Sequence, residues 1–463
     1  MADAPTVRLI SLGCARNDVD SDELAGRLSA SGWDLVDSDD AELVVVNTCG
    51  FIESAKAESI ETILAASEDT KVVAVGCMAE RYGQELATQL PEAAAVIGFD
   101  GYADIDERLR AVRRGESLPS HEPRDRRELL PITPVDRPGL SVPPGHSAGV
   151  DLPASVLRRE LRSDSPVAPL KIASGCDRRC AFCAIPRFRG SFVSRPAGDI
   201  LEEAAWLAQR GIREVLLVSE NSTSYGKDLG DPRLLEKLLP QLAETVERVR
   251  ITYLQPAEVR PRLLEVIATT PGVASYFDLS FQHASAPLLR RMRRFGGTAS
   301  FVDMVDQIRE LDPEAGIRSN VIVGFPGETE DDVAELLEFL GRARLDAVGV
   351  FGYSDEEDTE GQRLDPKVDQ DEIRARVEEV TSVADAVSEQ RAQERDASSA
   401  QVLIQSAEDD GLLGKAAFQG PEDGSVWIDT ATAAESGWVI GDLVELELRH
   451  AEGVDFIGSV RNS

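Results

Sequence analysis

The chain has 463 residues, and 42% of them are hydrophobic, which is ordinary for a globular protein and leaves room for several domains of about 100–200 residues. No apolar run approaches the about 18 residues of a membrane span, and the start lacks the basic flank of a signal peptide, so we expect a cytoplasmic protein without a membrane segment. A formal net charge of −34 argues against a general polyanion binder, because nucleic-acid-binding proteins usually carry a basic stripe.

The first part of the chain alternates strand and helix patterns. The expected strands are 7–12, 42–47, 71–76 and 94–98, and the expected helices are 21–31 and 52–66. The second strand is continuously apolar, as is typical of a parallel strand that is buried on both faces. We therefore predict a doubly wound α/β domain over residues 1–115.

Three cysteines follow three of these strands. Cys14, Cys49 and Cys77 come after the first, second and third strand, at the carboxyl ends where open α/β sheets place their ligand sites. One buried cysteine is common, but three equivalent placements are hard to attribute to packing. We predict a metal cluster bound by these three thiolates.

A proline-rich segment, residues 116–166, then interrupts the pattern. Its prolines include Pro119, Pro123, Pro131, Pro134, Pro138, Pro143, Pro144 and Pro153. His121 and His146 also lie here, but the segment supplies no partners for a zinc site. We expect a solvated linker or a partly ordered loop.

Strand and helix patterns return between residues 167 and 393. The expected strands are 170–174, 214–219, 248–254, 276–282, 318–325 and 347–353, with helices at 198–209, 233–246 and 329–342 among others. Six βα units predict an open, partial (β/α)6 barrel, with its site at the carboxyl ends of the strands. Residues 370–394 are expected to form a helix that leads out of the barrel.

Cys176, Cys180 and Cys183 follow the first barrel strand with Cys-x-x-x-Cys-x-x-Cys spacing. Structural zinc and ordinary electron-transfer clusters take four ligands, whereas three thiolates on a 4Fe–4S cluster leave one iron open. Three buried cysteines, or a zinc knuckle without its fourth ligand, are the alternatives. No histidine or fourth cysteine lies nearby to complete a zinc site.

Residues 394–463 read as a small antiparallel β-barrel of five short strands: 401–405, 412–418, 425–429, 442–449 and 455–460. They carry fourteen acidic and four basic residues, a net charge of −10. Such a barrel would repel phosphates and attract a basic protein. A merely solvated acidic surface is the alternative.

With both cysteine sets placed, the whole chain apart from the linker resembles the methylthiotransferases of the radical S-adenosylmethionine (SAM) superfamily. Besides the central cysteines, the matching motifs are Ser-Leu-Gly-Cys-Ala-Arg-Asn from Ser11, Asn-Thr-Cys-Gly-Phe-Ile from Asn47, Gly76-Cys77, Arg-Phe-Arg-Gly from Arg187 and Gly-Phe-Pro-Gly-Glu from Gly324. The domain order also matches, with a TRAM-like barrel at the end. The linker is longer than the family leads one to expect.

The resemblance implies two 4Fe–4S clusters and SAM in two roles. Cys176, Cys180 and Cys183 would be the catalytic set, where SAM acts as radical source. The cluster on Cys14, Cys49 and Cys77 would carry sulfur, with SAM as methyl donor. A reductant such as flavodoxin or ferredoxin would supply electrons.

The resemblance also suggests SAM contacts, with simple barrel packing as the alternative for each: Phe182, Glu220, Ser280, Gln282 and Arg318. Phe182 would pack on the adenine, and Glu220 would bind the amino nitrogen, although methylthiotransferases often have glutamine there. Ser280 and Gln282 would face the ribose, and Arg318 the carboxylate. His283 lies near the expected barrel mouth, where a structural role is equally open.

Two branches of the family compete. The motifs around Cys14 and Cys49 are similar to the RimO-like branch, which modifies an aspartate side chain of the twelfth small-subunit ribosomal protein. The acidic barrel favours the same branch, and RNA contact is then expected only on the ribosome. Methylthiolation of an adenosine next to the tRNA anticodon (MiaB-like) is the alternative, and a non-catalytic iron–sulfur carrier is a more distant one.

Overall fold

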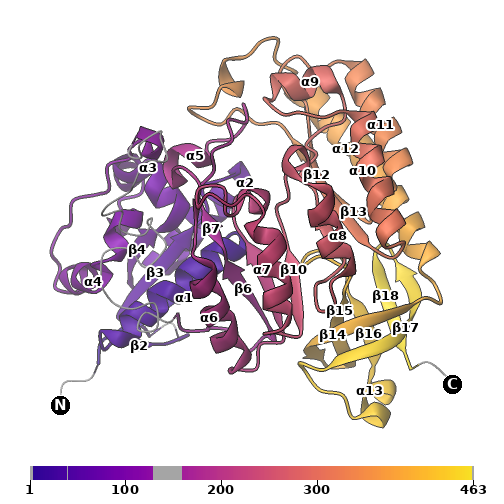
Figure 1. Cartoon of the computed structure of the whole chain (residues 1–463). Helices are drawn as coiled ribbons and strands as arrows, with labels where there is room; N and C mark the ends of the chain where they lie inside the picture. Colours follow the sequence, from indigo (N-terminus) through magenta and orange to yellow (C-terminus); the bar gives the residue numbers. More distant parts are fainter. Residues whose placement is uncertain (1–3, 39, 129–158, 461–463) are drawn as a thin grey trace. The chain divides into compact units, whose positions relative to one another are not determined.

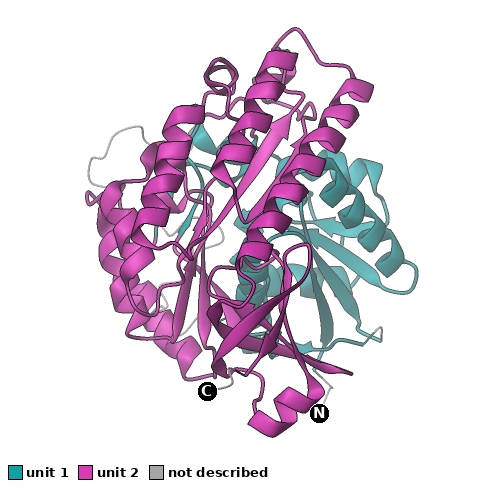
Figure 2. Cartoon of the chain, turned by 90° about the vertical axis from the view of Figure 1, so that its right-hand side faces the viewer, with its two compact units in different colours: residues 1–164, 173–178, 184–194 teal, residues 165–172, 179–183, 195–463 magenta. Residues whose placement is uncertain are grey.

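The computed structural model describes residues 4–38, 40–128 and 159–460. The chain divides into two compact units (Figure 2). Unit 1 comprises residues 1–164, 173–178 and 184–194, and unit 2 comprises residues 165–172, 179–183 and 195–463. Among the described residues, no helix is both long and apolar enough to cross a membrane.

Unit 1 is built on a five-stranded parallel sheet in the order β2-β1-β3-β4-β5 (Figure 1). The strands are β1 (Thr6–Ser11), β2 (Asp34–Leu35), β3 (Leu43–Thr48), β4 (Lys71–Val75) and β5 (Ala93–Val96). All six residues of β3 are buried, which explains its continuously apolar run. The four predicted strands and the doubly wound class are confirmed, and only the two-residue β2 was not expected.

Four α-helices connect and cover these strands: α1 (Ala15–Ala30), α2 (Glu53–Ser67), α3 (Gly76–Gln89) and α4 (Ile105–Arg113). Two were predicted, although α1 begins six residues earlier than expected because Cys14 is its N-cap residue. The other two, α3 and α4, were not predicted. Two further short segments of unit 1 hold β7 (Ala173–Ser174) and, in the second, α5 (Ile185–Arg189) and β8 (Val193–Ser194).

The described start of the proline-rich segment packs against the sheet domain. The amide of His121 donates to the Val96 carbonyl (3.2 Å), and Arg126, in a short 3-10 turn (Arg126–Glu128), pairs with buried Glu80 (2.5 Å). Of the two expectations for this segment, the solvated linker is therefore wrong at its described start, where a buried ion pair holds the chain, and an ordered loop is found there. His146 and the prolines from Pro131 to Pro153 lie outside the described residues.

Unit 2 contains six parallel strands: β6 (Val167–Lys171), β9 (Glu214–Val218), β10 (Arg248–Ile251), β11 (Tyr276–Asp278), β12 (Gly316–Val323) and β13 (Ala347–Gly352). They pair as two three-stranded sheets, which a bridge between Leu254 and Leu279 connects. The helices are α6 (Ala197–Ala208), α7 (Leu234–Ala243), α8 (Pro261–Thr269), α9 (Ala286–Arg291), α10 (Thr298–Leu311), α11 (Glu330–Ala343) and α12 (Gln370–Glu394). The predicted partial barrel is confirmed, including its exit helix α12.

The last strands close into a barrel in the order β14-β15-β16-β18-β17. Its elements are β14 (Ser399–Glu408), β15 (Gly411–Ala416), β16 (Val426–Asp429), α13 (Thr430–Ser436), β17 (Leu443–Glu452) and β18 (Asp455–Ser459). The five strands were predicted, but the antiparallel assignment is wrong in one respect. β16 and β18 run parallel, with Val426 opposite Phe456, because the chain places β17 on the far side of β18.

The carboxyl-terminal barrel packs against the amino ends of the partial-barrel strands. Arg248 and Arg250, at the start of β10, are buried with Glu214, the first residue of β9. Arg248 donates to the Lys415 carbonyl (3.0 Å) and Arg250 to the Ala417 carbonyl (2.8 Å). Active sites of (β/α) barrels lie at the opposite, carboxyl ends, so the small barrel is separated from that mouth by the length of the strands.

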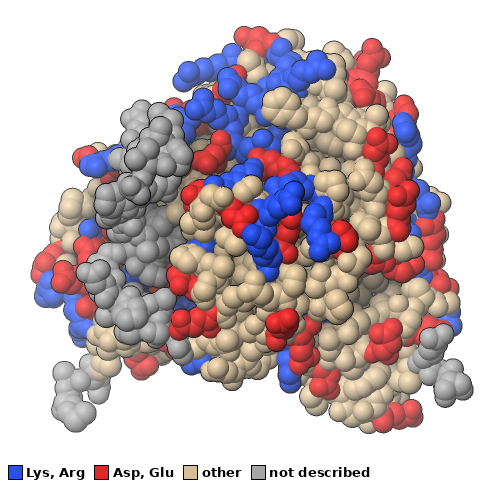
Figure 3. Space-filling view, viewed as in Figure 1, with Lys and Arg blue, Asp and Glu red and all other residues tan. Residues whose placement is uncertain are grey.

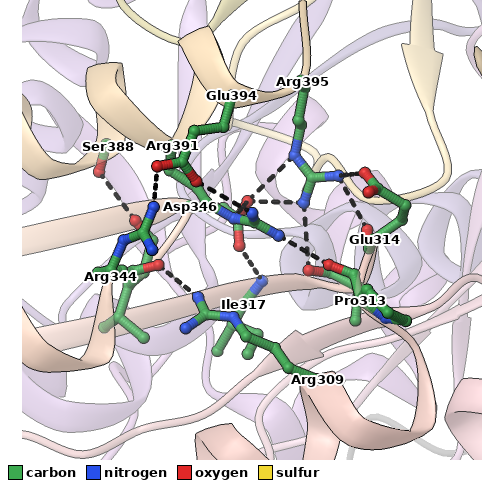
Figure 4. Close-up of polar contacts among 12 residues, drawn as sticks. Arg309, Pro313, Glu314, Ile317, Arg344, Asp346, Ser388, Arg391, Glu394 and Arg395 are labelled. Carbon is green, nitrogen blue, oxygen red and sulfur yellow. Dashed lines mark hydrogen bonds and ion pairs between the residues drawn. The ribbon is translucent and has the colours of Figure 1, made fainter. Parts of the chain in front are cut away.

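A second group of contacts secures the end of α12 (Figure 4). Buried Arg395 pairs with Asp346 (2.7 Å) and Glu314 (2.8 Å), and Arg391 lies 3.3 Å from the same Asp346 carboxylate. Removing one partner of a buried ion pair leaves a costly uncompensated charge. The network therefore holds the end of α12, which leads into the small barrel, to the rest of unit 2.

Candidate metal centres

Three loops of unit 1 carry the first cysteine set. Cys14 caps α1 after β1, Cys49 directly follows β3, and Cys77 is the second residue of α3 after β4. β1, β3 and β4 are neighbours in the parallel sheet. Their carboxyl ends therefore meet at one sheet edge, as the sequence predicted for these three residues.

Two glycines allow these loops to approach one another closely. A Cβ atom at Gly13 would lie 2.8 Å from the Cβ of Cys49 and 3.0 Å from its sulfur, and the φ of Gly13 is +96°. A Cβ at Gly50 would lie 2.9 Å from the backbone of Met78. Both positions need glycine for space, and Gly13 needs it for backbone conformation as well.

Asn17 ties the three loops together. Its Nδ2 donates to the carbonyls of Leu12 (2.8 Å) and Thr48 (3.2 Å), and its Oδ1 lies 3.6 Å from the Cys77 sulfur. Asn47 in turn donates to the Asn17 carbonyl (2.9 Å). Neither asparagine was a predicted site residue, although both stand in the motifs that carried the family resemblance.

Arg189, the last residue of α5, brings a positive charge to the set. Its Nη2 lies 3.1 Å from the Cys77 sulfur, and its side chain is buried. Burial raises the pKa of Cys77 to about 11, and the charge of Arg189 opposes that shift. Burial also raises the pKa of Cys49. Thiols in such a place become thiolates when a metal binds them.

The chemistry of the first cysteine set suits an iron–sulfur cluster. All six cysteines are free thiols. Within the described ranges, no three His, Cys, Asp or Glu side chains converge closely enough to hold one metal ion. A 4Fe–4S cluster binds each thiolate through a different iron. The three thiols at one sheet edge, the space that Gly13 and Gly50 leave beside them and the buried guanidinium of Arg189 fit a 4Fe–4S cluster.

The central set lies in the loop between β7 and α5. Cys176, which belongs to unit 1, donates its amide to the Gly190 carbonyl (3.0 Å). Gly175 before it has a φ of +81°, and a Cβ there would lie 2.2 Å from the Ser191 carbonyl oxygen. The start of the loop is thus closed tightly onto its end.

Cys180 and Cys183 belong to unit 2, where the Cys183 amide donates to the Cys180 carbonyl (3.2 Å). Arg294 is buried, with Nη1 at 3.7 Å from the Cys180 sulfur, and it also donates to the Ser280 carbonyl. The same arginine therefore brings Ser280, a predicted SAM contact, close to the cysteine loop. Arg294 itself was not predicted.

Three of the other predicted SAM contacts lie near the carboxyl ends of the barrel strands or in the cysteine loop. Phe182 is half-buried beside Cys183, and Glu220 is half-buried two residues after β9. Gln282 has a φ of +71°, and its backbone N–H donates to the backbone carbonyl of Asn320 (2.9 Å). These positions agree with the carboxyl-end mouth of the barrel.

Arg318 is different, because it is the third residue of β12 and lies toward the amino end of that strand. Its Nε pairs with Asp423 of the small barrel (2.8 Å). The contact with Asp423 therefore argues against Arg318 as a ligand of the SAM carboxylate, and we leave it out of the proposed site. His283 is fully buried 3.3 Å from Glu328, which gives it a packing role.

Comparison with known proteins agrees with the N-terminal α/β domain and with the partial barrel. Residues 6–98 match the "Uncharacterized protein family UPF0004", and residues 170–340 match the "Radical SAM superfamily". The chain is similar in fold to the radical SAM methyltransferase TsrM from Kitasatospora setae, with a TM-score of 0.52 at 15% identity over 75% of this chain and 73% of that one.

Closer relatives cover nearly the whole chain. The ribosomal protein uS12 methylthiotransferase RimO of Saccharopolyspora erythraea is 58% identical over 97% of this chain and 94% of its own length. The protein of the same name from Cutibacterium acnes is 56% identical over 99% and 98%. Such relatives favour an enzyme over a non-catalytic iron–sulfur carrier. With both cysteine sets in place and this degree of identity, the chain belongs to the RimO family of radical SAM methylthiotransferases.

Proposed function

We propose that this protein methylthiolates the β-carbon of an aspartate side chain in ribosomal protein uS12, in the cytoplasm. The observation that carries the proposal is the pair of three-cysteine sets, one at the sheet edge of unit 1 and one in the loop that follows β7. The near full-length similarity to RimO proteins supports the choice of substrate.

The reaction requires more than acid–base chemistry, because the substrate carbon is saturated and its hydrogen is not acidic. When bound, a 4Fe–4S cluster with SAM supplies one-electron hydrogen abstraction, and the second cluster supplies a sulfur donor. Cys176, Cys180 and Cys183 would hold the first cluster, and Cys14, Cys49 and Cys77 the second. A flavodoxin or ferredoxin would deliver the electrons.

The protein's own residues would orient these groups and exclude water. Phe182, Glu220, Ser280 and Gln282 are the proposed SAM contacts, since Phe182 lies within the cysteine loop and each of the others closely follows the end of a barrel strand. Arg294 would fix Cys180 relative to Ser280 through its two contacts.

The substrate proposal draws on charge as well. Acidic side chains are spread over the visible face of the small barrel (Figure 3). Among its described residues, Arg449 is the one exposed basic side chain, because Arg395 is buried and Lys415 is half-buried. A basic ribosomal protein would be attracted to this face, and RNA contact would arise only on the ribosome.

Charge reversal in the small barrel tests this docking role. Glu408, Asp409 and Asp410 are exposed, and replacing all three by lysine should raise KM for uS12 several-fold while kcat stays within about twofold. The chemistry should survive because the barrel packs at the amino ends of the strands. The effect should shrink as salt rises, since exposed charges are screened over about 8 Å at physiological ionic strength. An unchanged KM would remove the barrel from substrate capture.

A competition assay tests the function itself. The reconstituted enzyme is offered uS12 and an adenosine-modified tRNA anticodon stem together, with SAM and a reductant, and each is then weighed by mass spectrometry. We expect the methylthio mass on an aspartate of uS12. Product on the RNA alone would establish the tRNA-modifying alternative instead.

A further inference from the structure

The side chain of Arg189, which follows the central cysteine motif in the sequence, reaches the N-terminal cysteine set (Cys14, Cys49 and Cys77) of unit 1. It stands six positions after Cys183 and ends the short helix α5. Its Nη2 lies 3.1 Å from the Cys77 sulfur and 3.1 Å from Oδ1 of Asn17, and its Nη1 pairs with Asp20 (3.1 Å). The guanidinium also lies 4.8 Å from the ring centroid of Phe99.

These contacts hold a buried charge in one orientation. The side chains of Arg189 and Asp20 are 4% and 1% exposed, so neither charge is screened effectively by water. Arginine remains charged in this environment, and its planar fork fixes the direction of each donated hydrogen bond. The Nη1 atom faces the carboxylate of Asp20, and the Nη2 atom faces the sulfur of Cys77.

Asp20 and Arg189 neutralise each other before any metal is considered. An oxidised 4Fe–4S core with three thiolate ligands has a negative net charge, because the thiolates carry more negative charge than the core carries positive charge. Reduction makes this net charge more negative. A cation that touches a ligand sulfur stabilises the reduced form more than the oxidised form, and net charge and hydrogen bonds to sulfur are known controls of cluster potential.

The residue after Arg189 contacts the other cysteine set. The Gly190 carbonyl accepts the amide hydrogen bond of Cys176 (3.0 Å). Two consecutive residues thus connect to Cys77 through a side chain and to Cys176 through the backbone. The position of the guanidinium therefore depends on the closed conformation of the central loop.

We propose that Arg189 is a positioning residue that pairs with the Cys77 thiolate and raises the reduction potential of the N-terminal cluster, with Asp20 as the counter-charge that moderates this effect. This inference rests on the proposed function only in assigning a cluster to Cys14, Cys49 and Cys77.

The test is a redox titration of that cluster alone. The full-length chain with Cys176, Cys180 and Cys183 replaced by alanine is reconstituted with iron and sulfide. The EPR signal of the reduced cluster is then followed against potential. R189Q should shift the midpoint to lower potential, R189K should lie between R189Q and the parent protein, and D20N should shift it to higher potential.

R187Q is the matched control. Arg187 lies on the same short helix, is one-third exposed and pairs with Asp125 at 3.8 Å. Its loss should leave the midpoint unchanged. A purely structural role for Arg189 predicts that R189Q and D20N disturb the cluster in the same direction, since each breaks the same ion pair.

Opposite shifts for R189Q and D20N therefore support the proposal, and shifts of the same sign or no shift overturn it. If R189Q does not retain iron, the directions of the midpoint shifts of R189K and D20N decide in its place. The titration uses neither SAM nor uS12, so its failure would not bear on the substrate. Likewise, product on tRNA in the competition assay would leave the measured potentials intact.

Discussion

The two cysteine sets differ in how far apart in the sequence their members lie. Cys14, Cys49 and Cys77 come from three loops and meet only because β1, β3 and β4 are neighbours in one parallel sheet. Cys176, Cys180 and Cys183 share one loop of the chain. The first set depends on the folding of a whole domain, whereas the second depends mainly on a local turn. Iron binding at the first set should therefore be coupled more strongly to folding.

The largest effect should follow from removing the central set. Replacing Cys176, Cys180 and Cys183 together by alanine should abolish SAM cleavage and product, and should reduce bound iron from about eight to about four per chain. Iron analysis and chromatography of 5′-deoxyadenosine measure the two losses. An iron content equal to that of the unaltered protein would contradict the assignment.

Removing the N-terminal set should have a narrower effect. The triple alanine variant at Cys14, Cys49 and Cys77 should also retain about four irons, and it should still cleave SAM while forming no methylthiolated uS12. The expected separation follows from the different loops that carry the sets. Loss of SAM cleavage in a variant that keeps its central iron would show that the two sets do not act separately.

A pair of glycines tests how far the first set depends on its loops. G13A places a Cβ 2.8 Å from the Cβ of Cys49, whereas G32A, at a similar positive φ of +83°, meets nothing within 4 Å. Both substitutions should cost about 1 kcal/mol in backbone strain, measured by thermal unfolding. Only G13A should also lower iron at the N-terminal set, measured in the background that lacks the central cysteines. Equal iron in the two variants would argue against close packing at Cys49.

The smallest effect concerns the arginine beside each set. Arg294 is 3.7 Å from the sulfur of Cys180, and Arg189 is 3.1 Å from that of Cys77. Cys180 is also more exposed than Cys77. R294Q should therefore lower the midpoint potential of the central cluster, but by less than R189Q lowers that of the other. R290Q, which changes an exposed arginine on α9, serves as the control. A larger shift for R294Q would reverse this order.

Much of this architecture could be predicted because local patterns and the rules of parallel sheets suffice for it. The apolar runs identified the strands, and the rule that parallel strands share their carboxyl edge brought Cys14, Cys49 and Cys77 together. Nothing comparable predicts that a side chain at position 189 meets Cys77. That contact depends on the path of the chain between strands far apart in the sequence.

Arg318 shows where the same rules were applied incompletely. The predicted strand began at that residue, which already put it at the end opposite the expected mouth. The parallel pairing of β16 and β18 had no such signal. Alternation gives the number of strands and their buried faces, but the order of strands in a barrel depends on how long connections cross it.

The arginines beneath the partial barrel bear on how this family could exchange substrates during evolution. Arg248, Arg250 and Arg395 donate to carbonyls or carboxylates across the junction with the small barrel and its leading helix, and Arg318 pairs with Asp423. A chimera that received the barrel of an RNA-modifying relative would leave Arg318 without its carboxylate unless the new barrel supplied one at the position of Asp423, whereas the backbone carbonyls that accept from Arg248 and Arg250 do not depend on the barrel's side chains. Recombination at this junction should therefore yield stable proteins only when the new barrel places a carboxylate opposite Arg318, so a change of substrate is more accessible through surface charges than through exchange of the module.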